Sequence, residues 1–391
     1  MQMRIYLDYA AATPVREEVL TAMRPYFTEQ FANPSAIHRE GQHARQAVDG
    51  ARMAVARLLK LRTEELTFTS GGTESNNLAL FGVVEAAFAE GKRGQDIEVI
   101  STAIEHPSVL EALAALARRG VTVHFAQVDG EGRIKIESLK KLLSPQTLLV
   151  TFAYVNSELG VVQDVRTIVR AVREDFGTCF VHLDASQAPL WLPCAMDSLG
   201  VDLMTLDAGK CYGPKGVGVL AHLRTVPLVP HLFGGGQERG LRPGTENVPL
   251  IVGCAEALRI AQAHWRERAD EVGTLRDFFF DELTKAIPEV KINGSREHRV
   301  ANNCNISIPG VDGEFAVVTL DARDIAASTR SACAGGTGSG SHVVAAITGD
   351  AERANSTLRF TLGEETTKED IVRAVKALSQ HVRAVKASLS A

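Results

Sequence analysis

The sequence has few cysteines, few aromatic residues and no long apolar run, and these shortages exclude several classes of protein. Its six cysteines include no Cys-x-x-Cys pair, which argues against a structural zinc site. No stretch approaches the length needed to span a bilayer, and the N-terminal MQMRIYLDYAAATP lacks the basic-then-apolar pattern of a secretory signal. We therefore expect a cytoplasmic protein that does not enter membranes.

The chain also lacks a large excess of either positive or negative charge. The 42 Lys and Arg residues nearly balance the 47 Asp and Glu residues, so the net charge of −5 gives no electrostatic reason to expect nucleic acid as a partner. The hydrophobic content of 45% is ordinary for a globular protein. At 391 residues the chain is long enough for two domains.

What the chain does have is an alternation of apolar runs and helical patterns. The expected strands are residues 65–70, 97–102, 121–128, 147–155, 180–186, 202–207 and 216–223. The expected helices between them include residues 74–90, 107–118 and 164–175. Near-continuous apolar strands alternating with helices predict an α/β fold with a mostly parallel sheet covered on both faces.

After about residue 255 the pattern changes. A long helical run over 255–286 is followed by strand-like CNISIPG, a helix at 313–320, strand-like LRFTL and a closing helix at 367–388. This order predicts a smaller α+β domain. We therefore expect a large domain over residues 15–255 and a small domain built from residues 1–14 and 256–391.

Polar residues follow several of the predicted strands. In open α/β sheets ligands bind at the carboxyl ends of the strands. The residues found there are His106, Asn156, Asp184, Gln187 and Lys210. In addition, a Gly-Gly-Thr-Glu turn at 71–74 follows the first strand and opens a helix, whose N–H groups suit an anion.

Such a set suits a pyridine cofactor held as a Schiff base. An amine forms the imine bond, a carboxylate pairs with the protonated ring nitrogen, and an aromatic ring stacks on the cofactor's face. Lys210 would be the amine, whereas Lys215 fits a solvated loop lysine. Spacing alone leaves open whether these residues share one site or have scattered structural roles.

The chain resembles the cysteine desulfurases, which are homodimeric pyridoxal 5′-phosphate enzymes of fold type I. The resemblance runs nearly end to end. It is carried by YLDYAAATP (6–14), NPSAIHREG (33–41), TSGGTESNN (69–77), EHPSVL (105–110), VNSELGVVQD (155–164), HLDASQ (182–187), GKCYGPKGVG (209–218), GGGQERGLRPGT (234–245), RSAC (330–333) and LRFTLG (358–363).

Taken position by position, the resemblance implies roles around the cofactor ring. Lys210 would form the imine, Asp184 would keep the pyridine nitrogen protonated, and His106 would stack on the ring and help to transfer protons. Asn156 and Gln187 would hydrogen-bond the ring hydroxyl, and Asn156 would also contact the substrate.

The resemblance further implies phosphate and substrate contacts. Gly72 and Thr73 would hold the phosphate, with Thr245 reaching over from the partner subunit. Arg359, helped by Asn33, would bind the carboxylate of L-cysteine bidentately.

Cys333 lies in the Gly/Ser-rich segment STRSACAGGTGSGS, on a loop of about residues 328–341, where nothing is expected to bury it. The resemblance implies that it attacks the substrate's sulfur, leaving L-alanine and an enzyme persulfide for a sulfur-acceptor or iron–sulfur scaffold protein. A free thiol has a pKa of about 8.5, so the attack needs help. Arg330 could supply positive charge or could simply be solvated. No metal site is expected, although Cys333 is a candidate ligand for a cluster.

The match fails immediately before the lysine. Many of these enzymes carry Ser-Gly-His, whereas residues 207–209 are Asp-Ala-Gly. A carboxylate near a phosphate is repulsive unless a cation intervenes. Either Asp207 points elsewhere, toward Lys215 or an arginine, or the phosphate cup has been rebuilt. We hypothesise that the cofactor is bound with looser phosphate contacts.

Two other functions stay open from the sequence. A selenocysteine lyase or another β-eliminating lyase would keep its activity when Cys333 is replaced. A non-catalytic dimeric scaffold relative would bind an acceptor protein without turnover, and the altered phosphate cup is its only support. The presence of both Lys210 and Cys333 counts against the scaffold, which needs neither.

Overall fold

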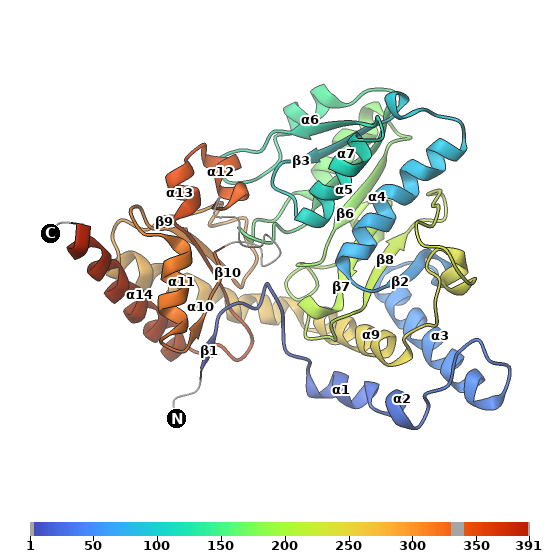
Figure 1. Ribbon diagram of the computed structural model, residues 1–391, viewed down its shortest axis with the longest axis horizontal. Coiled ribbons are helices and arrows are strands. Elements are labelled where there is room, and N and C mark those ends of the chain that lie inside the picture. The colour runs from blue at the N-terminus through green and yellow to red at the C-terminus, as the bar shows by residue number, and fades with distance from the viewer. Residues whose placement is uncertain (1–3, 330–339, 390–391) are drawn as a thin grey trace.

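The computed structural model describes residues 4–329 and 340–389, and a seven-stranded sheet forms its centre (Figure 1). The strand order is β2-β8-β7-β6-β5-β3-β4. The strands are β2 (Leu66–Thr69), β3 (Glu98–Thr102), β4 (Thr122–Ala126), β5 (Thr147–Ala153), β6 (Phe180–Asp184), β7 (Leu203–Asp207) and β8 (Gly218–His222). Of these seven, β8 alone runs in the opposite direction and is antiparallel to both β2 and β7. The predicted mostly parallel sheet is confirmed.

Successive residues of each strand enter two different cores. Val99 and Leu149 pack with helices on one face of the sheet, whereas Ile100 and Val150 belong to the core on the other face. Because side chains alternate along a strand and both faces are covered, the strands are continuous apolar runs in the sequence. The covering helices are α4 (Gly72–Ala89) and α5 (Pro107–Ala117) on the first face, and α3 (Arg39–Leu59), α7 (Val165–Asp175) and α9 (Val248–Ala263) on the second.

The C-terminal part forms a smaller body on the other side of Figure 1. Its antiparallel sheet has the order β12-β10-β9 and packs against helices α10, α11 and α14. The elements are β9 (Lys291–Ile292), β10 (Asn303–Ser307), β12 (Thr357–Thr361), α10 (Trp265–Ala286), α11 (Gly313–Asp321), α12 (His342–Thr348), α13 (Ala351–Asn355) and α14 (Lys368–Leu389). No described helix is long and apolar enough to cross a membrane.

The predicted helical run over 255–286 is two helices. His264 has non-helical backbone angles and separates α9 from α10. The two helices have different neighbours, since α9 packs on α3 and on α1 (Glu17–Met23), whereas α10 packs on α14. The division of the chain into domains at about residue 255 stays a prediction.

The first residues of the chain cross from the small body to the large one. Strand β1 (Ile5–Tyr6) pairs with β11 (Ile325–Ala326), and Asp8 bridges to Thr361 of β12. A few residues later Thr13 reaches the connection after β7, where its N–H donates to the carbonyl of Gly209 at 3.1 Å. Residues 5–13 therefore contact both the small and the large body and lie between them.

The outer edge of β2 is covered by a short turn, η4 (Gln237–Gly240). The carboxylate of Glu238 accepts the Phe68 N–H at 2.9 Å and forms a buried ion pair with Arg52 of α3. Arg239 donates to the carbonyl of Leu66 at 3.1 Å. Glu238 and Arg239 both have positive φ angles, of 47° and 57°, which side chains rarely adopt. The contacts with β2 hold the turn in this conformation.

Candidate active site

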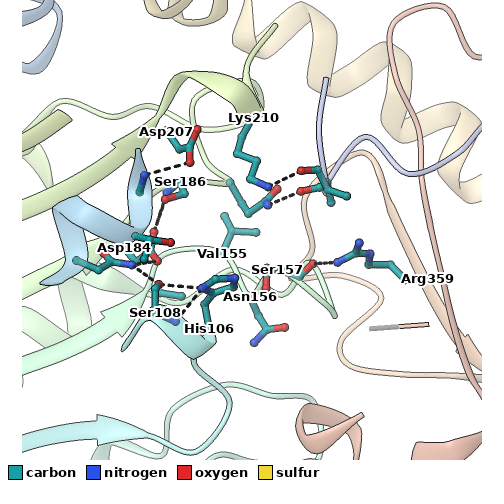
Figure 2. A pocket seen from close by; sticks show the side chains of 17 residues that line it. His106, Ser108, Val155, Asn156, Ser157, Asp184, Ser186, Asp207, Lys210 and Arg359 are labelled. Carbon is teal, nitrogen blue, oxygen red and sulfur yellow. Dashed lines mark hydrogen bonds between the residues drawn. The ribbon is translucent and has the colours of Figure 1, made fainter. Parts of the chain in front are cut away.

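A pocket lies where strands β5, β6 and β7 end, between the large sheet, the N-terminal segment and β12 (Figure 2). His106, Asn156, Asp184, Gln187 and Lys210 all line it. The structure therefore brings together five polar residues from the ends of four different strands. Gly72, Thr73 and Arg359 line the same pocket, and Figure 2 shows Arg359 entering from the small body.

Asp184, at the end of β6, is the centre of a buried hydrogen-bond network. Its Oδ1 accepts from the backbone N–H and the hydroxyl of Ser186, at 3.0 and 2.6 Å. Its Oδ2 accepts from Nδ2 of Asn76 at 2.8 Å, and the same amide donates to Oγ of Ser108 at 2.9 Å. Asn76 therefore links the carboxylate to the residues around His106.

His106 caps α5 immediately before Pro107, at the strand end where the sequence placed it. The Ser108 N–H donates to its Nδ1 at 3.1 Å, which puts the ring proton on Nε2. Burial lowers the pKa of His106 below its ordinary 6.5, and the charge of Lys210 acts in the same direction against that of Asp184. The imidazole is therefore neutral at pH 7 and can hold or give a proton at Nε2.

Glu105 lies behind the pocket wall and is fully buried. Its Oε1 accepts from the hydroxyl of Thr102 at 2.5 Å. Burial raises the pKa of Glu105 to about 8 despite this hydrogen bond, and the Asp184 carboxylate adds to the rise. Glu105 is therefore a neutral acid below about pH 8.

Lys210 ends η3 (Ala208–Lys210), the turn that follows β7. Its Nζ donates to the carbonyl oxygen of Ala11 at 2.6 Å (Figure 2). The hydroxyl of Thr13 also donates to the carbonyl of Gly209 at 3.1 Å. The N-terminal segment therefore positions both the backbone and the amine of this lysine.

The glycine turn before α4 brings the amino end of that helix to the pocket. Gly71 has a φ of 152°, a conformation that side chains rarely adopt. A Cβ atom on Gly72 would lie 3.0 Å from Oγ of Ser186 and 3.2 Å from Oδ2 of Asp207, which is closer than ordinary contact. A side chain at this position would require Ser186 and Asp207 to shift by a few tenths of an ångström.

Asp207 points into this turn. Its Oδ2 accepts the N–H of Gly72 at 3.1 Å and its Oδ1 accepts the N–H of Gly209 at 2.9 Å. Lys215, one of the partners considered for it, donates instead to the carbonyl of Thr13 at 2.6 Å. The carboxylate therefore lies at the amino end of α4, as Figure 2 shows.

Arg359 is 1% exposed and lies on β12. Its Nη1 donates to the carbonyl of Ser157 at 3.0 Å and its Nη2 to Oδ1 of Asp8 at 2.9 Å. Its Nε is buried and has no hydrogen-bond partner among the residues that the structure describes. Because a buried donor without a partner is costly, this atom suits a carboxylate entering the pocket.

Asn156 and Gln187 line the pocket but also hold its backbone. Asn156 donates to the carbonyl of Ile104 at 2.7 Å and accepts the N–H of Leu159 at 2.8 Å, which fixes the turn after β5. Gln187 donates to the carbonyl of Ala10 at 2.9 Å. The contact of each with a ring hydroxyl stays a prediction.

Two predicted site residues lie elsewhere. Asn33 and Thr245 line a separate depression, next to Glu246, and neither lines the pocket of Lys210. Cys333 and Arg330 fall outside the described residues, so their predicted roles have no structural account.

The remaining cysteines are free and buried: Cys179, Cys194, Cys211, Cys254 and Cys304. Burial raises the pKa of each of these thiols. They are core thiols, as predicted from their apolar surroundings. Within residues 4–329 and 340–389, no group of three or more His, Cys, Asp or Glu side chains could hold a metal ion.

Sequence reasoning missed several residues of the pocket. Asn76 lies one helical turn after Gly72, so its spacing alone could have placed it on the same face of α4. Ser108 and Ser186 lie two residues after His106 and Asp184. Asp8 gave no signal, because its contact with Arg359 joins positions 351 residues apart.

The pocket fits the ring of pyridoxal phosphate. Asp184 offers a buried carboxylate to a protonated ring nitrogen, Lys210 offers an amine to the aldehyde, and His106 offers a flat ring. The end of the pocket at the start of α4, where the resemblance places the phosphate, is different. There the N–H of Gly72 already donates a hydrogen bond to Asp207.

Comparisons with known proteins agree with this chemistry. Residues 5–374 match the family model of the class-V aminotransferases. Cysteine desulfurase IscS of Dictyoglomus turgidum is 39% identical over 95% of this chain and 92% of its own. The solved structure of a NifS-like protein superposes with a TM-score of 0.90 at 34% identity, covering 97% of this chain and all of that one. SspA, solved in complex with cysteine, superposes with a TM-score of 0.79 at 33% identity, covering 92% of this chain and 98% of that one. The chain belongs to the class-V aminotransferase family and, within it, to the pyridoxal-phosphate-dependent cysteine desulfurases.

Proposed function

We propose that this pocket removes sulfur from L-cysteine with pyridoxal phosphate, leaving L-alanine and a persulfide on Cys333. The observation that carries the proposal is the meeting of Lys210, Asp184 and His106 with Arg359, whose buried Nε has no partner among the described residues. When bound, the cofactor supplies an electron sink for the substrate's carbon atoms.

Each side chain has a separate task. Arg359 orients the substrate through its carboxylate, and Asp184 keeps a proton on the ring nitrogen. Lys210 provides the amine, and His106 holds a proton at Nε2. The Cys333 thiolate attacks the sulfur of L-cysteine, so that an S–S bond forms and the Cβ–S bond breaks. The electron pair of the broken bond stays with the carbon, which takes up a proton and becomes the methyl group of alanine.

We also propose a homodimer that works in the cytoplasm. Asn33 and Thr245 share a depression away from the pocket, which is where residues serving a partner subunit's site would lie. The persulfide would pass to a sulfur-acceptor protein or an iron–sulfur scaffold. Crosslinking and light scattering of the purified protein test the dimer.

The central experiment measures alanine and protein-bound sulfur after the purified protein is mixed with pyridoxal phosphate and L-cysteine. We expect equal amounts of alanine and of a one-sulfur mass gain on Cys333 in the first turnover. Cys333→Ser should abolish both, whereas Cys179→Ala, which removes a buried thiol, should keep them. Undiminished turnover of L-cysteine or selenocysteine in Cys333→Ser would favour a β-eliminating lyase or a selenocysteine lyase. Absence of any turnover in the wild type would favour the scaffold.

A further inference from the structure

The amino end of α4 already holds an anion of the chain itself. This helix is 18 residues long, and its first N–H groups face the pocket without partners inside the helix. One of them, the N–H of Gly72, donates to Asp207, whose second oxygen is bound by the N–H of Gly209. Both carboxylate oxygens are therefore satisfied by the backbone.

The neighbouring groups are also engaged. The hydroxyl of Ser186 donates to Asp184, and Lys215 donates to the carbonyl of Thr13. A second carboxylate at this helix end, Glu74, accepts the N–H of Ser70 at 2.6 Å and pairs with Arg242 at 3.1 Å. The arginine beside this helix end therefore already neutralises an acid of the chain.

A phosphate entering this end of the pocket meets the Asp207 carboxylate at the N–H of Gly72, the first N–H of the helix. Two anions a few ångströms apart repel, and the helix end stabilises only the one that it contacts. Pyridoxal without its phosphate avoids this conflict and still reaches Lys210 and Asp184. The ring end would therefore supply most of the cofactor's affinity.

We infer that Asp207 is a built-in competitor for the cofactor's phosphate, so that this chain distinguishes pyridoxal phosphate only weakly from pyridoxal. The inference rests on the proposed function, since it concerns the same cofactor. It makes Asp207 the residue that sets cofactor specificity.

The test titrates cofactor-free full-length protein with pyridoxal phosphate and, separately, with pyridoxal, following the visible absorption of the lysine-bound cofactor. We expect the two Kd values of the wild type to lie within about tenfold of each other. Asp207→Ser and Asp207→Asn should tighten pyridoxal phosphate about 10- to 100-fold and leave pyridoxal within about twofold. Asp207→Glu keeps the charge and should behave as the wild type.

Two results would overturn the inference while leaving the proposed function intact. One is a wild type that prefers pyridoxal phosphate by more than about a thousandfold. The other is a pair of variants in which both compounds tighten equally or neither changes. Absence of lysine-bound colour with either compound, in the wild type and in every variant, contradicts the proposed function itself and the inference with it.

Thermal unfolding gives a second readout that does not depend on colour. Without cofactor, Asp207→Ser should melt below the wild type, because the N–H groups of Gly72 and Gly209 lose their acceptor. Saturating pyridoxal phosphate should raise the Tm of Asp207→Ser and Asp207→Asn more than that of the wild type. An equal or smaller rise in both variants also overturns the inference.

Discussion

The two ends of the pocket are built in different ways. At the ring end, Asp184, Asn76, Ser108 and His106 come from three separate segments and share one chain of side-chain hydrogen bonds. At the other end, the Asp207 carboxylate accepts hydrogen bonds from two backbone N–H groups, those of Gly72 and Gly209. A change at the ring end disturbs every member of the network, whereas a change at residue 207 leaves that network intact. A pocket of this kind can keep its chemistry while its anchoring of the cofactor changes.

The largest effect should come from Lys210, which belongs to the ring end. Lys210→Ala removes the amine that bonds the cofactor, so we expect alanine production to fall by at least about a thousandfold. The visible band of the bound cofactor should disappear as well. Lys215→Ala is the control, because Lys215 donates to the backbone of Thr13 and should leave the band in place. Retention of the band in Lys210→Ala would contradict the assignment.

Asp184→Asn should have the next largest effect. It removes the charge that holds the ring proton. Because asparagine keeps only one acceptor oxygen, either Asn76 or Ser186 also loses its acceptor, so we expect kcat to fall about 100- to 1,000-fold at full cofactor occupancy. Turnover and absorbance are measured on the same sample. A loss no larger than that of Asp207→Asn would break the distinction between the two ends.

Arg359→Lys tests the substrate side. Lysine keeps a charge but loses the planar donors that contact Ser157 and Asp8, so we expect KM for L-cysteine to rise about 10- to 100-fold with a smaller change in kcat. Steady-state kinetics at saturating cofactor checks this. An unchanged KM would mean that the buried Nε does not receive the substrate's carboxylate.

The smallest expected effect is on thermal stability and comes from Glu105, which is buried next to the ring end of the pocket and interacts electrostatically with Asp184. Its pKa of about 8 in the folded protein lies above the ordinary 4.5, so the folded state binds the extra proton. Stability is therefore fully present below about pH 4.5 and declines as pH rises toward 8. Glu105→Gln should match the wild type at pH 5 and melt about 2–5 °C higher at pH 8.5. Equal melting temperatures at both pH values would show that Glu105 carries no such penalty.

The sequence could predict the strands and the residues at their carboxyl ends, because both follow from local pattern and sheet topology. It could place Lys210 and Asp184 at strand ends for that reason, and the resemblance to the cysteine desulfurases implied that they share one pocket. It could not orient Asp207, since the choice between the helix end and Lys215 depends on backbone groups 135 residues away. It also joined α9 and α10 into one run, because the break between them is the single residue His264 and no Gly or Pro marks it. The roles of Asn33 and Thr245 stay predictions, because they depend on the proposed second subunit.

The turn η4 has a consequence for whether the edge strand β2 can pair with another molecule. On the outer edge of β2, Glu238 accepts the N–H of Phe68 and Arg239 donates to the carbonyl of Leu66. Both η4 residues have positive φ angles, and this backbone strain favours dissociation of the turn from the strand. Loss of the Arg52–Glu238 pair would release the carboxylate that binds the Phe68 N–H, and this backbone group could then pair with a strand from another molecule.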